Sequence, residues 1–218
     1  MRKLAAPCFI TLEGIEGSGK TSQIANITEF FGQRGIPIQA TREPGGTEIA
    51  DRIRRLLVEP HTEPLEPMAE LLLYSAARNQ HVARVIQPAL AAGQIVLCDR
   101  FTDSTIAYQH YGRGIDLGTV TQVNAWATDG LSPDLTVYLD CDPEIGLERS
   151  KDRLDKADSP ETRFEAESLE FHNRVRTGFL ELARHQKDRI VVIDAAAEPA
   201  TVAAQIQAEL AKRFGLDA

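Results

Sequence analysis

Gly14-Ile15-Glu16-Gly17-Ser18-Gly19-Lys20-Thr21 sets the architecture that we expect for this chain. It matches the pattern G-x-x-x-x-G-K-[ST] of phosphate-binding loops (P-loops). Glycines in such a loop let successive backbone N–H groups converge on one anion, because no side chain intrudes. Lys20 can reach the β- and γ-phosphates of a nucleotide, and the Thr21 hydroxyl can bind Mg²⁺. The alternative interpretation is a glycine-rich turn beside a solvated lysine.

The flanks of this loop have the structures that a P-loop requires. Residues 8–12 form a short, β-prone apolar run, and the residues after the loop carry apolar side chains at helical spacing (Ile24, Ile27, Phe30 and Phe31). A helix in that place adds the positive end of its dipole to a phosphate site. Both flanks therefore favour a P-loop over a simple turn.

Strand-like and helical segments alternate along the rest of the chain. The expected strands span residues 9–12, 36–40, 95–98, 135–139 and 189–193. The expected helices span about 22–34, 48–58, 67–91, 104–109, 119–129, 165–186 and 199–214, with another that begins near residue 143. Most strand runs are continuously apolar, as in Ile95-Val96-Leu97-Cys98, which is typical of strands covered on both faces. We therefore expect an α/β fold with a mainly parallel sheet between helix layers.

Composition and charge restrict the class of protein. A chain of 218 residues fits one domain, and a formal net charge of −8 argues against non-specific nucleic-acid binding. No apolar run approaches the roughly 20 residues of a membrane span, and the first residues lack the apolar core of a signal peptide. Cys8, Cys98 and Cys141 each fall in a strand-like run, which predicts buried thiols in the reducing cytoplasm.

A second polar site follows the strand predicted at residues 95–98. Asp99 would lie at the carboxyl edge of the sheet, where open α/β folds bind ligands. In P-loop enzymes an acid in this place works on Mg²⁺, directly or through water. Arg100 could clamp a second phosphate through two hydrogen bonds. A salt-bridged strand end is the alternative, but pairing with the P-loop favours the ligand site.

Two further segments could contact a ligand. In residues 41–47, Pro44-Gly45-Gly46 forces a turn and lets a ligand approach the backbone closely, although a plain tight turn would look the same. Tyr74 and Arg78 are four residues apart, so they share a helix face and could frame a flat ring. The alternative for this pair is an arginine stem lying over a core tyrosine.

Residues 151–162 are polar and contain Pro160, so we expect a mobile surface flap there. Such a flap could bring cations onto a transferring phosphoryl group. A solvated, charged loop is the alternative. The basic residues in and beside the flap are Arg149, Lys151, Arg153 and Arg163.

Together these pieces resemble the thymidylate kinase family. The matching segments are Leu12–Thr21, Thr41–Thr47, Asp99–Phe101, Ser104-Thr105 with Ala107–Gln109, and Leu139-Asp140 with Pro143–Leu147. They occur in the family's order, and the similarity continues to Ile193-Asp194-Ala195. The resemblance implies a P-loop NTPase-type three-layer α/β sandwich, with a five-stranded parallel sheet, helices on both faces and a short lid. It also implies one domain over residues 1–218, with the lid at about residues 149–163.

The resemblance further implies a kinase that transfers the γ-phosphoryl group of ATP to dTMP with Mg²⁺, giving dTDP, in a cytoplasmic homodimer. ATP and Mg²⁺ would be held by Gly14, Ile15, Glu16, Gly17, Ser18, Gly19, Lys20, Thr21, Ser22 and Arg149, with Thr21 and Asp99 serving the metal. The dTMP positions are Glu16, Pro44, Arg54, Tyr74, Arg78, Arg100, Ser104, Thr105, Tyr108 and Gln109. The catalytic positions are Glu16, Lys20, Arg100 and Arg153.

Within the dTMP set the family assigns separate tasks. Arg54 and Arg100 match positions that grip the phosphate. Tyr74 matches the residue that stacks on thymine, with Pro44 lining its methyl side. Arg78 and Thr105 match the residues that bond the polar edge of the base. Tyr108 matches the residue that leaves no room for a ribose 2′-hydroxyl group. Glu16 matches the acid that engages the 3′-hydroxyl side of the acceptor.

Position 17 identifies the subclass. Residue 17 is glycine, whereas the eukaryotic-type enzymes carry an arginine at this place in the P-loop. The bacterial-type enzymes lack this arginine and supply a cation from the lid instead. We expect Arg153 to be this cation. The sequence departs from close relatives at three places: Lys151 replaces an arginine, residues 155–161 look like an insertion in the lid, and Tyr74 replaces the commoner phenylalanine.

Three other functions fit a P-loop. Another nucleoside monophosphate kinase, for AMP or UMP, would not need the thymine-side residues Pro44, Tyr74, Arg78 and Thr105. A deoxynucleoside kinase has a neutral acceptor and little use for Arg54 and Arg100. A P-loop switch protein such as a GTPase needs the guanine-reading pattern N-K-x-D, which does not occur in the sequence.

Overall fold

Residues 7–157 and 160–216 are the part of the chain that the computed structural model describes. Within them, five parallel strands form one sheet in the order β2-β3-β1-β4-β5. The strands are β1 (Cys8–Glu13), β2 (Ile38–Arg42), β3 (Ile95–Asp99), β4 (Leu135–Asp140) and β5 (Ile190–Asp194). The predicted parallel sheet is confirmed. The second strand starts two residues later than predicted, because Pro37 has no N–H to donate to the ladder.

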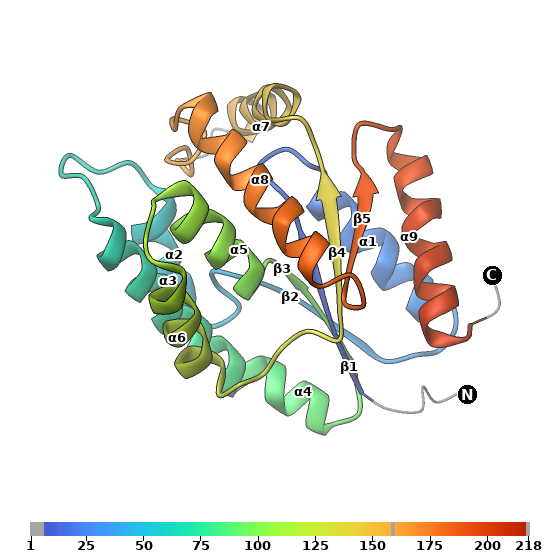
Figure 1. The fold of residues 1–218 in the computed structure, drawn as a ribbon. Helices are drawn as coiled ribbons and strands as arrows, with labels where there is room; N and C mark the ends of the chain where they lie inside the picture. Colours follow the sequence, from blue (N-terminus) through green and yellow to red (C-terminus); the bar gives the residue numbers. More distant parts are fainter. Residues whose placement is uncertain (1–6, 158–159, 217–218) are drawn as a thin grey trace.

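Helices cover both faces of the sheet, as predicted. Figure 1 shows α1 (Lys20–Gly32) and α9 (Pro199–Phe214) side by side on one face. The other face carries α2 (Glu48–Val58), α3 (Pro67–His81), α4 (Gln87–Ala91), α5 (Thr102–Thr105), α6 (Leu117–Thr128) and α8 (Leu169–His185). Helix α7 (Pro143–Ala157) follows β4 and lies above the carboxyl ends of the strands.

Two helical segments contain π-helical turns that the sequence pattern did not reveal. The single helix predicted over residues 67–91 is α3, then η1 (Val82–Ile86), then α4. The helix predicted near residues 104–109 is α5 continued by η2 (Ile106–Gly112). A π turn shifts the faces that later side chains present, and such turns are frequent at functional sites. Tyr108 and Gln109 lie within η2.

The core lies on both sides of the central strands. Side chains of β1, the first four residues of β3 and the first five residues of β4 are buried, and so are the three predicted cysteines. The expectation of strands covered on both faces is wrong for β5, where the Val192 side chain is 44 % exposed, because β5 is an edge strand. β2, the other edge strand, is likewise only partly buried.

The expected flap starts later than residue 151. Residues 151–157 belong to α7, so the prediction of an irregular segment is wrong there. Gly146, Ser150 and Leu154 are buried at a spacing of four, and this stripe holds the helix on its neighbours despite the charged sequence. Residues 158–159, inside the predicted insertion, lie outside the described residues, as does the amino-terminal segment 1–6. We use the term flap below for residues 160–168.

The described helices include none with the length and apolar character that a bilayer span requires.

Candidate active site

The P-loop connects β1 to α1, as the sequence predicts. Gly14, Gly17 and Gly19 have positive φ angles of 153°, 68° and 90°, which side-chain-bearing residues rarely adopt. Gly17 also packs against the first turn of α7, since a Cβ atom added there would lie 1.9 Å from the carbonyl oxygen of Gly146. The loop conformation and its contact with α7 both require glycine at position 17.

Lys20 lies against the loop that it follows. Its Nζ atom donates to the carbonyl oxygens of Gly14 at 2.9 Å and Ile15 at 2.8 Å. Burial, together with the nearby Arg100 cation, lowers the pKa of Lys20 to about 8. The two hydrogen bonds hold the ammonium beside the loop at neutral pH. It could exchange them for hydrogen bonds to phosphate oxygens without leaving the loop.

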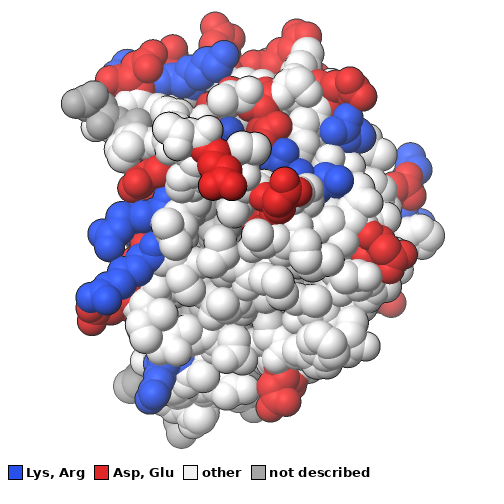
Figure 2. All heavy atoms as spheres, turned by 90° about the vertical axis from the view of Figure 1, so that its left-hand side faces the viewer, with Lys and Arg blue, Asp and Glu red and all other residues white. Residues whose placement is uncertain are grey.

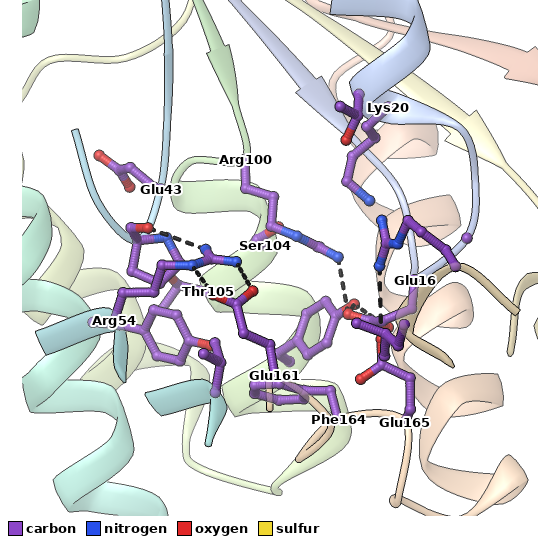
Figure 3. Close-up of a pocket in the computed structure, with 18 of the residues that line it drawn as sticks. Glu16, Lys20, Glu43, Arg54, Arg100, Ser104, Thr105, Glu161, Phe164 and Glu165 are labelled. Carbon is purple, nitrogen blue, oxygen red and sulfur yellow. Dashed lines mark hydrogen bonds and ion pairs between the residues drawn. The ribbon is translucent and has the colours of Figure 1, made fainter. Parts of the chain in front are cut away.

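A pocket of about 280 Å³ extends from the P-loop across the carboxyl edge of the sheet (Figure 3). The structure brings together at its walls all the predicted dTMP positions: Glu16, Pro44, Arg54, Tyr74, Arg78, Arg100, Ser104, Thr105, Tyr108 and Gln109. Gly17, Gly19, Lys20, Thr21, Ser22, Arg149 and Arg153 line it as well. Four predicted site residues do not line it, namely Gly14, Ile15, Ser18 and Asp99.

Glu16 lies between the two ends of the pocket. Its carboxylate accepts hydrogen bonds from Arg100 Nη2 at 2.9 Å and from the Tyr108 hydroxyl at 2.7 Å. Burial opposes ionisation of Glu16, but Arg100, His172 and Lys20 outweigh it and hold its pKa well below the usual range. The Tyr108 ring packs edge-to-face against Phe164 at 5.5 Å, so the floor of the pocket is rigid.

Arg100 is held by a residue that sequence reasoning missed. Its φ angle is 69°, in the left-handed region. The buried Glu13 carboxylate accepts the next backbone N–H, that of Phe101, at 2.8 Å and the Ser104 hydroxyl at 2.5 Å. Arg100 Nη1 donates to the same hydroxyl at 3.1 Å. Burial and the neighbouring Asp103 raise the pKa of Glu13 to about 8. Glu13 thus supports both the strained turn and the guanidinium.

Asp99 and Thr21 provide oxygen ligands suited to Mg²⁺. Asp99 Oδ1 is buried, and within residues 7–157 and 160–216 it has no hydrogen-bond partner. An orphaned buried carboxylate oxygen at the carboxyl end of β3 is costly unless a cation or water satisfies it. Thr21 lines the pocket in the first turn of α1. The residues present therefore fit a divalent cation.

The wall around Arg78, here called the base wall, is buried and fully connected. Arg78 is 2 % exposed and donates to Glu43 Oε2 at 2.7 Å, Thr105 Oγ1 at 2.8 Å, Asn124 Oδ1 at 2.7 Å and the Phe101 carbonyl at 3.0 Å. Arginine has five N–H groups, so among the described residues one of them remains for a ligand. Sequence analysis identified Arg78 and Thr105 but missed Glu43, although Glu43 lies in the quoted segment 41–47.

Arg54 has a partner that the sequence did not predict. Its Nη2 and Nε atoms contact the Glu161 carboxylate from the flap at 2.6 and 3.1 Å, and Nη1 donates to the Pro44 carbonyl at 3.2 Å (Figure 3). This paired geometry is the one by which arginine also holds phosphate. The Arg54 hydrogen bonds hold the pKa of Glu161 below its usual range. A carboxylate thus occupies the pair of N–H groups on Arg54 that the sequence predicts for a phosphate.

The basic residues of the lid separate into two groups. Arg153 lines the pocket, is 58 % exposed, and donates to Ser150 Oγ at 3.0 Å with Glu165 at 4.0 Å. Arg149 also lines the pocket and donates to the Ala195 carbonyl at 3.1 Å. Arg163 instead pairs with the buried Glu70 at 2.6 Å and anchors the flap. Lys151 is exposed and is not among the lining residues.

The chain is similar to known thymidylate kinases over most of its length. The family model described as thymidylate kinase matches residues 12–206. A thymidylate kinase of Trichlorobacter lovleyi is 52 % identical over 209 residues, covering 95 % of this chain and 99 % of that protein. One from a Synechococcus species is 52 % identical over 208 residues, 95 % of this chain and 96 % of its own. The crystal structure of thymidylate kinase from Ehrlichia chaffeensis is similar with a TM-score of 0.75 and 35 % identity, covering 94 % of this chain and 99 % of that one.

Proposed function

The chain belongs to the thymidylate kinase family, and we propose from that premise how its own residues carry out the reaction. The enzyme transfers the γ-phosphoryl group of ATP to dTMP and releases ADP and dTDP. The observation that carries our assignment of residues is the single pocket that joins the P-loop to the base wall. Catalysis of phosphoryl transfer depends almost entirely on positioning and charge, and one shared pocket supplies both.

The donor end of the pocket binds ATP. The backbone N–H groups of residues 14–21 and the Lys20 ammonium hold the phosphates, Lys20 exchanging its bonds to the Gly14 and Ile15 carbonyls for bonds to phosphate oxygens. Ser22 and Arg149 complete this end of the pocket. The bond from the γ-phosphorus to the β,γ-bridging oxygen breaks, and that oxygen leaves on ADP.

The acceptor end binds dTMP. Tyr74 stacks on thymine, Pro44 lies beside its methyl group, and the base wall bonds its polar edge through Arg78 and Thr105. Gln109 also faces this end, although its amide donates to the buried Glu70 at 2.9 Å. The preformed base wall selects a pyrimidine that presents an acceptor to Arg78.

Between the two ends, charge is placed where phosphate oxygens must approach each other. Arg54 and Arg100 hold the acceptor phosphate, whose oxygen forms the new bond to the γ-phosphorus. Glu16 and Tyr108 fix Arg100 and border the deoxyribose, with Ser104 supporting Arg100 from behind. Arg153 reaches in from α7 and stabilises the charge of the transition state, as an arginine finger does.

We also assign Mg²⁺ to Thr21 and Asp99. The orphaned oxygen of Asp99 supports this assignment. When bound, the ion neutralises charge on the β- and γ-phosphates of ATP.

A homodimer would cover an exposed apolar face on helices α2, α3 and α6. Figure 2 views the molecule from this side, where an area of uncharged side chains lies below a charged rim. Its exposed apolar residues include Ile49, Met68, Leu72, Leu117 and Trp126, the last of these 71 % exposed. Contiguous patches of this kind mark association sites. We further propose that the chain acts as a single domain, with a lid at about residues 149–163, and works in the cytoplasm, where its three free cysteines stay reduced.

The dimer surface can be tested by measuring molar mass with light scattering. We expect Trp126→Glu to yield a monomer, because a charge in the centre of an apolar interface stays unpaired. Val192→Glu is the matched control, since Val192 is an exposed apolar residue on the opposite edge of the molecule. A wild-type monomer, or a Trp126→Glu dimer, would contradict the assignment.

The activity itself is tested by competition at fixed ATP and Mg²⁺. We expect turnover with dTMP, weaker use of dUMP, and little use of UMP or AMP, because the Tyr108 ring and the base wall exclude a 2′-hydroxyl and a purine. Phosphorylation of AMP or UMP in preference to dTMP would contradict the assigned acceptor residues.

A further inference from the structure

The ring of His172 connects the floor of the active site to the flap. His172 lies on α8 and is completely buried. Its Nε2 atom is 3.0 Å from the carbonyl oxygen of Phe164, and its Nδ1 atom is 3.5 Å from Glu16 Oε2. Each ring nitrogen therefore faces an oxygen that accepts hydrogen bonds.

These contacts determine which protons the ring carries. A carbonyl oxygen only accepts, so Nε2 must donate to Phe164 and carries a hydrogen. Among the described residues Nδ1 has no hydrogen-bond partner, and an oxygen of the Glu16 carboxylate lies 3.5 Å from it. A neutral ring would point the lone pair of the fully buried Nδ1 atom at an anion, whereas an imidazolium points an N–H group at it.

The surroundings of the ring support a positive charge. Glu16 is the anion on the P-loop side, and it is shared with the Arg100 guanidinium and the Tyr108 hydroxyl of η2. On the flap side, Glu165 follows Phe164 in sequence and accepts from Ser150 of α7 at 2.6 Å, with Arg153 at 4.0 Å. Lys20 adds a further positive charge near Glu16.

We propose that His172 is a positioning residue, whose imidazolium holds the Glu16 carboxylate through Nδ1–H and anchors the flap at Phe164 through Nε2–H. This inference rests on the proposed function, because it matters for catalysis only if Glu16 orders the site. Without the Nδ1–H group, Glu16 keeps only Arg100 and Tyr108 as donors, while the flap anchor at Phe164 stays. The turnover number then falls, because Glu16 no longer holds its place in the site.

Three substitutions separate the two contacts of the ring. The amide nitrogen of asparagine takes the place of Nδ1, that of glutamine takes the place of Nε2, and phenylalanine keeps the ring without either donor. We expect His172→Asn to keep kcat within about threefold of wild type, since its donor to Glu16 is retained. We expect His172→Gln and His172→Phe to lower kcat about tenfold to a hundredfold, since a donor to a charged group is lost.

The split between kcat and KM distinguishes positioning from a merely structural role. His172→Gln should lower kcat with the KM for dTMP nearly unchanged, whereas His172→Asn, whose amide still donates to Glu16, should keep both values near those of the wild type. Thermal unfolding of each variant shows that it is folded at the assay temperature. Equal kcat losses in His172→Asn and His172→Gln would overturn the proposal.

Nitrogen-15 NMR of histidine-labelled enzyme reads the charge without relying on activity. The sequence has five histidines, and the His172→Gln spectrum assigns the signals of interest. At neutral pH we expect both ring nitrogens of His172 to be protonated. A neutral ring there overturns this inference and leaves the proposed function standing. Full turnover by Glu16→Gln would instead remove the proposed role of Glu16, and this inference with it.

Discussion

The base wall and the lid side of the same pocket are built in opposite ways. Arg78, in the base wall, is 2 % exposed, and its partners come from elements packed on the sheet. Arg54 and Arg153, on the lid side, are more exposed, and their carboxylate neighbours Glu161 and Glu165 belong to the flap. The wall that we propose for the base is thus complete before any ligand arrives, whereas the side that we propose for the phosphates depends on where the flap lies.

The largest expected effect concerns the lid side. Arg153→Ala should lower kcat about 10³-fold, because a cation of this kind acts mainly on the transition state. The Kd for dTMP, measured by calorimetry, should change little. Lys151→Ala is the matched control, since Lys151 is exposed two residues away and is not a lining residue. A loss of dTMP affinity with unchanged kcat would show that Arg153 binds the ground state instead.

The base wall should respond in binding and in stability together. Arg78→Ala should weaken dTMP binding about a hundredfold and leave ATP binding nearly unchanged. It should also lower the free energy of unfolding by about 3 kcal/mol, because the buried Glu43 carboxylate loses its cation. The double variant Arg78→Ala, Glu43→Gln should recover stability but not dTMP binding. Equal losses of affinity for both nucleotides would mean that Arg78 does not read the base.

ATP binding at the P-loop should depend on pH in a way that the base wall and the lid side do not. The pKa of Lys20 is lowered to about 8, so below that pH the ammonium is already charged and ATP affinity is constant. Above it, ATP binding must take up a proton, and the affinity should fall about tenfold per pH unit. Titration calorimetry at pH 8.5 in buffers of different ionisation enthalpy measures that proton uptake. Binding without proton uptake would place the titration elsewhere.

The smallest expected effect concerns the ion pair between Arg54 and Glu161 on the lid side. Glu161→Gln should lower the KM for dTMP about two- to fivefold with little change in kcat, because a partly exposed ion pair no longer competes for Arg54. Glu48→Gln is a suitable control, since it removes an exposed carboxylate from the same helix as Arg54. A raised KM would mean that Glu161 helps Arg54 to bind phosphate.

The sequence predicted the sheet and the residues that line the pocket better than the residues that support them. The P-loop, Asp99-Arg100 and the pair Tyr74 and Arg78 carry local patterns with a chemical meaning. Glu13, Glu43 and His172 do not, because the partners of Glu13 and Glu43 and the Glu16 partner of His172 lie 35 to 156 residues away in the sequence, and only the folded sheet brings them close. The flap was misjudged for a similar reason, since its charged sequence concealed the buried stripe at Gly146, Ser150 and Leu154.

The contact between Gly17 and Gly146 limits how this enzyme could evolve. An arginine at position 17, as the eukaryotic-type enzymes have, would need a Cβ atom 1.9 Å from the Gly146 carbonyl and a backbone at φ 68° that arginine rarely adopts. No single substitution could therefore move the cation that we propose in the lid to the P-loop, because the start of α7 would have to shift away first. An inhibitor could be designed to contact Gly17 and Gly146 together. Resistance mutations at either glycine would destabilise the fold, because an added Cβ atom would clash with the backbone of the other segment.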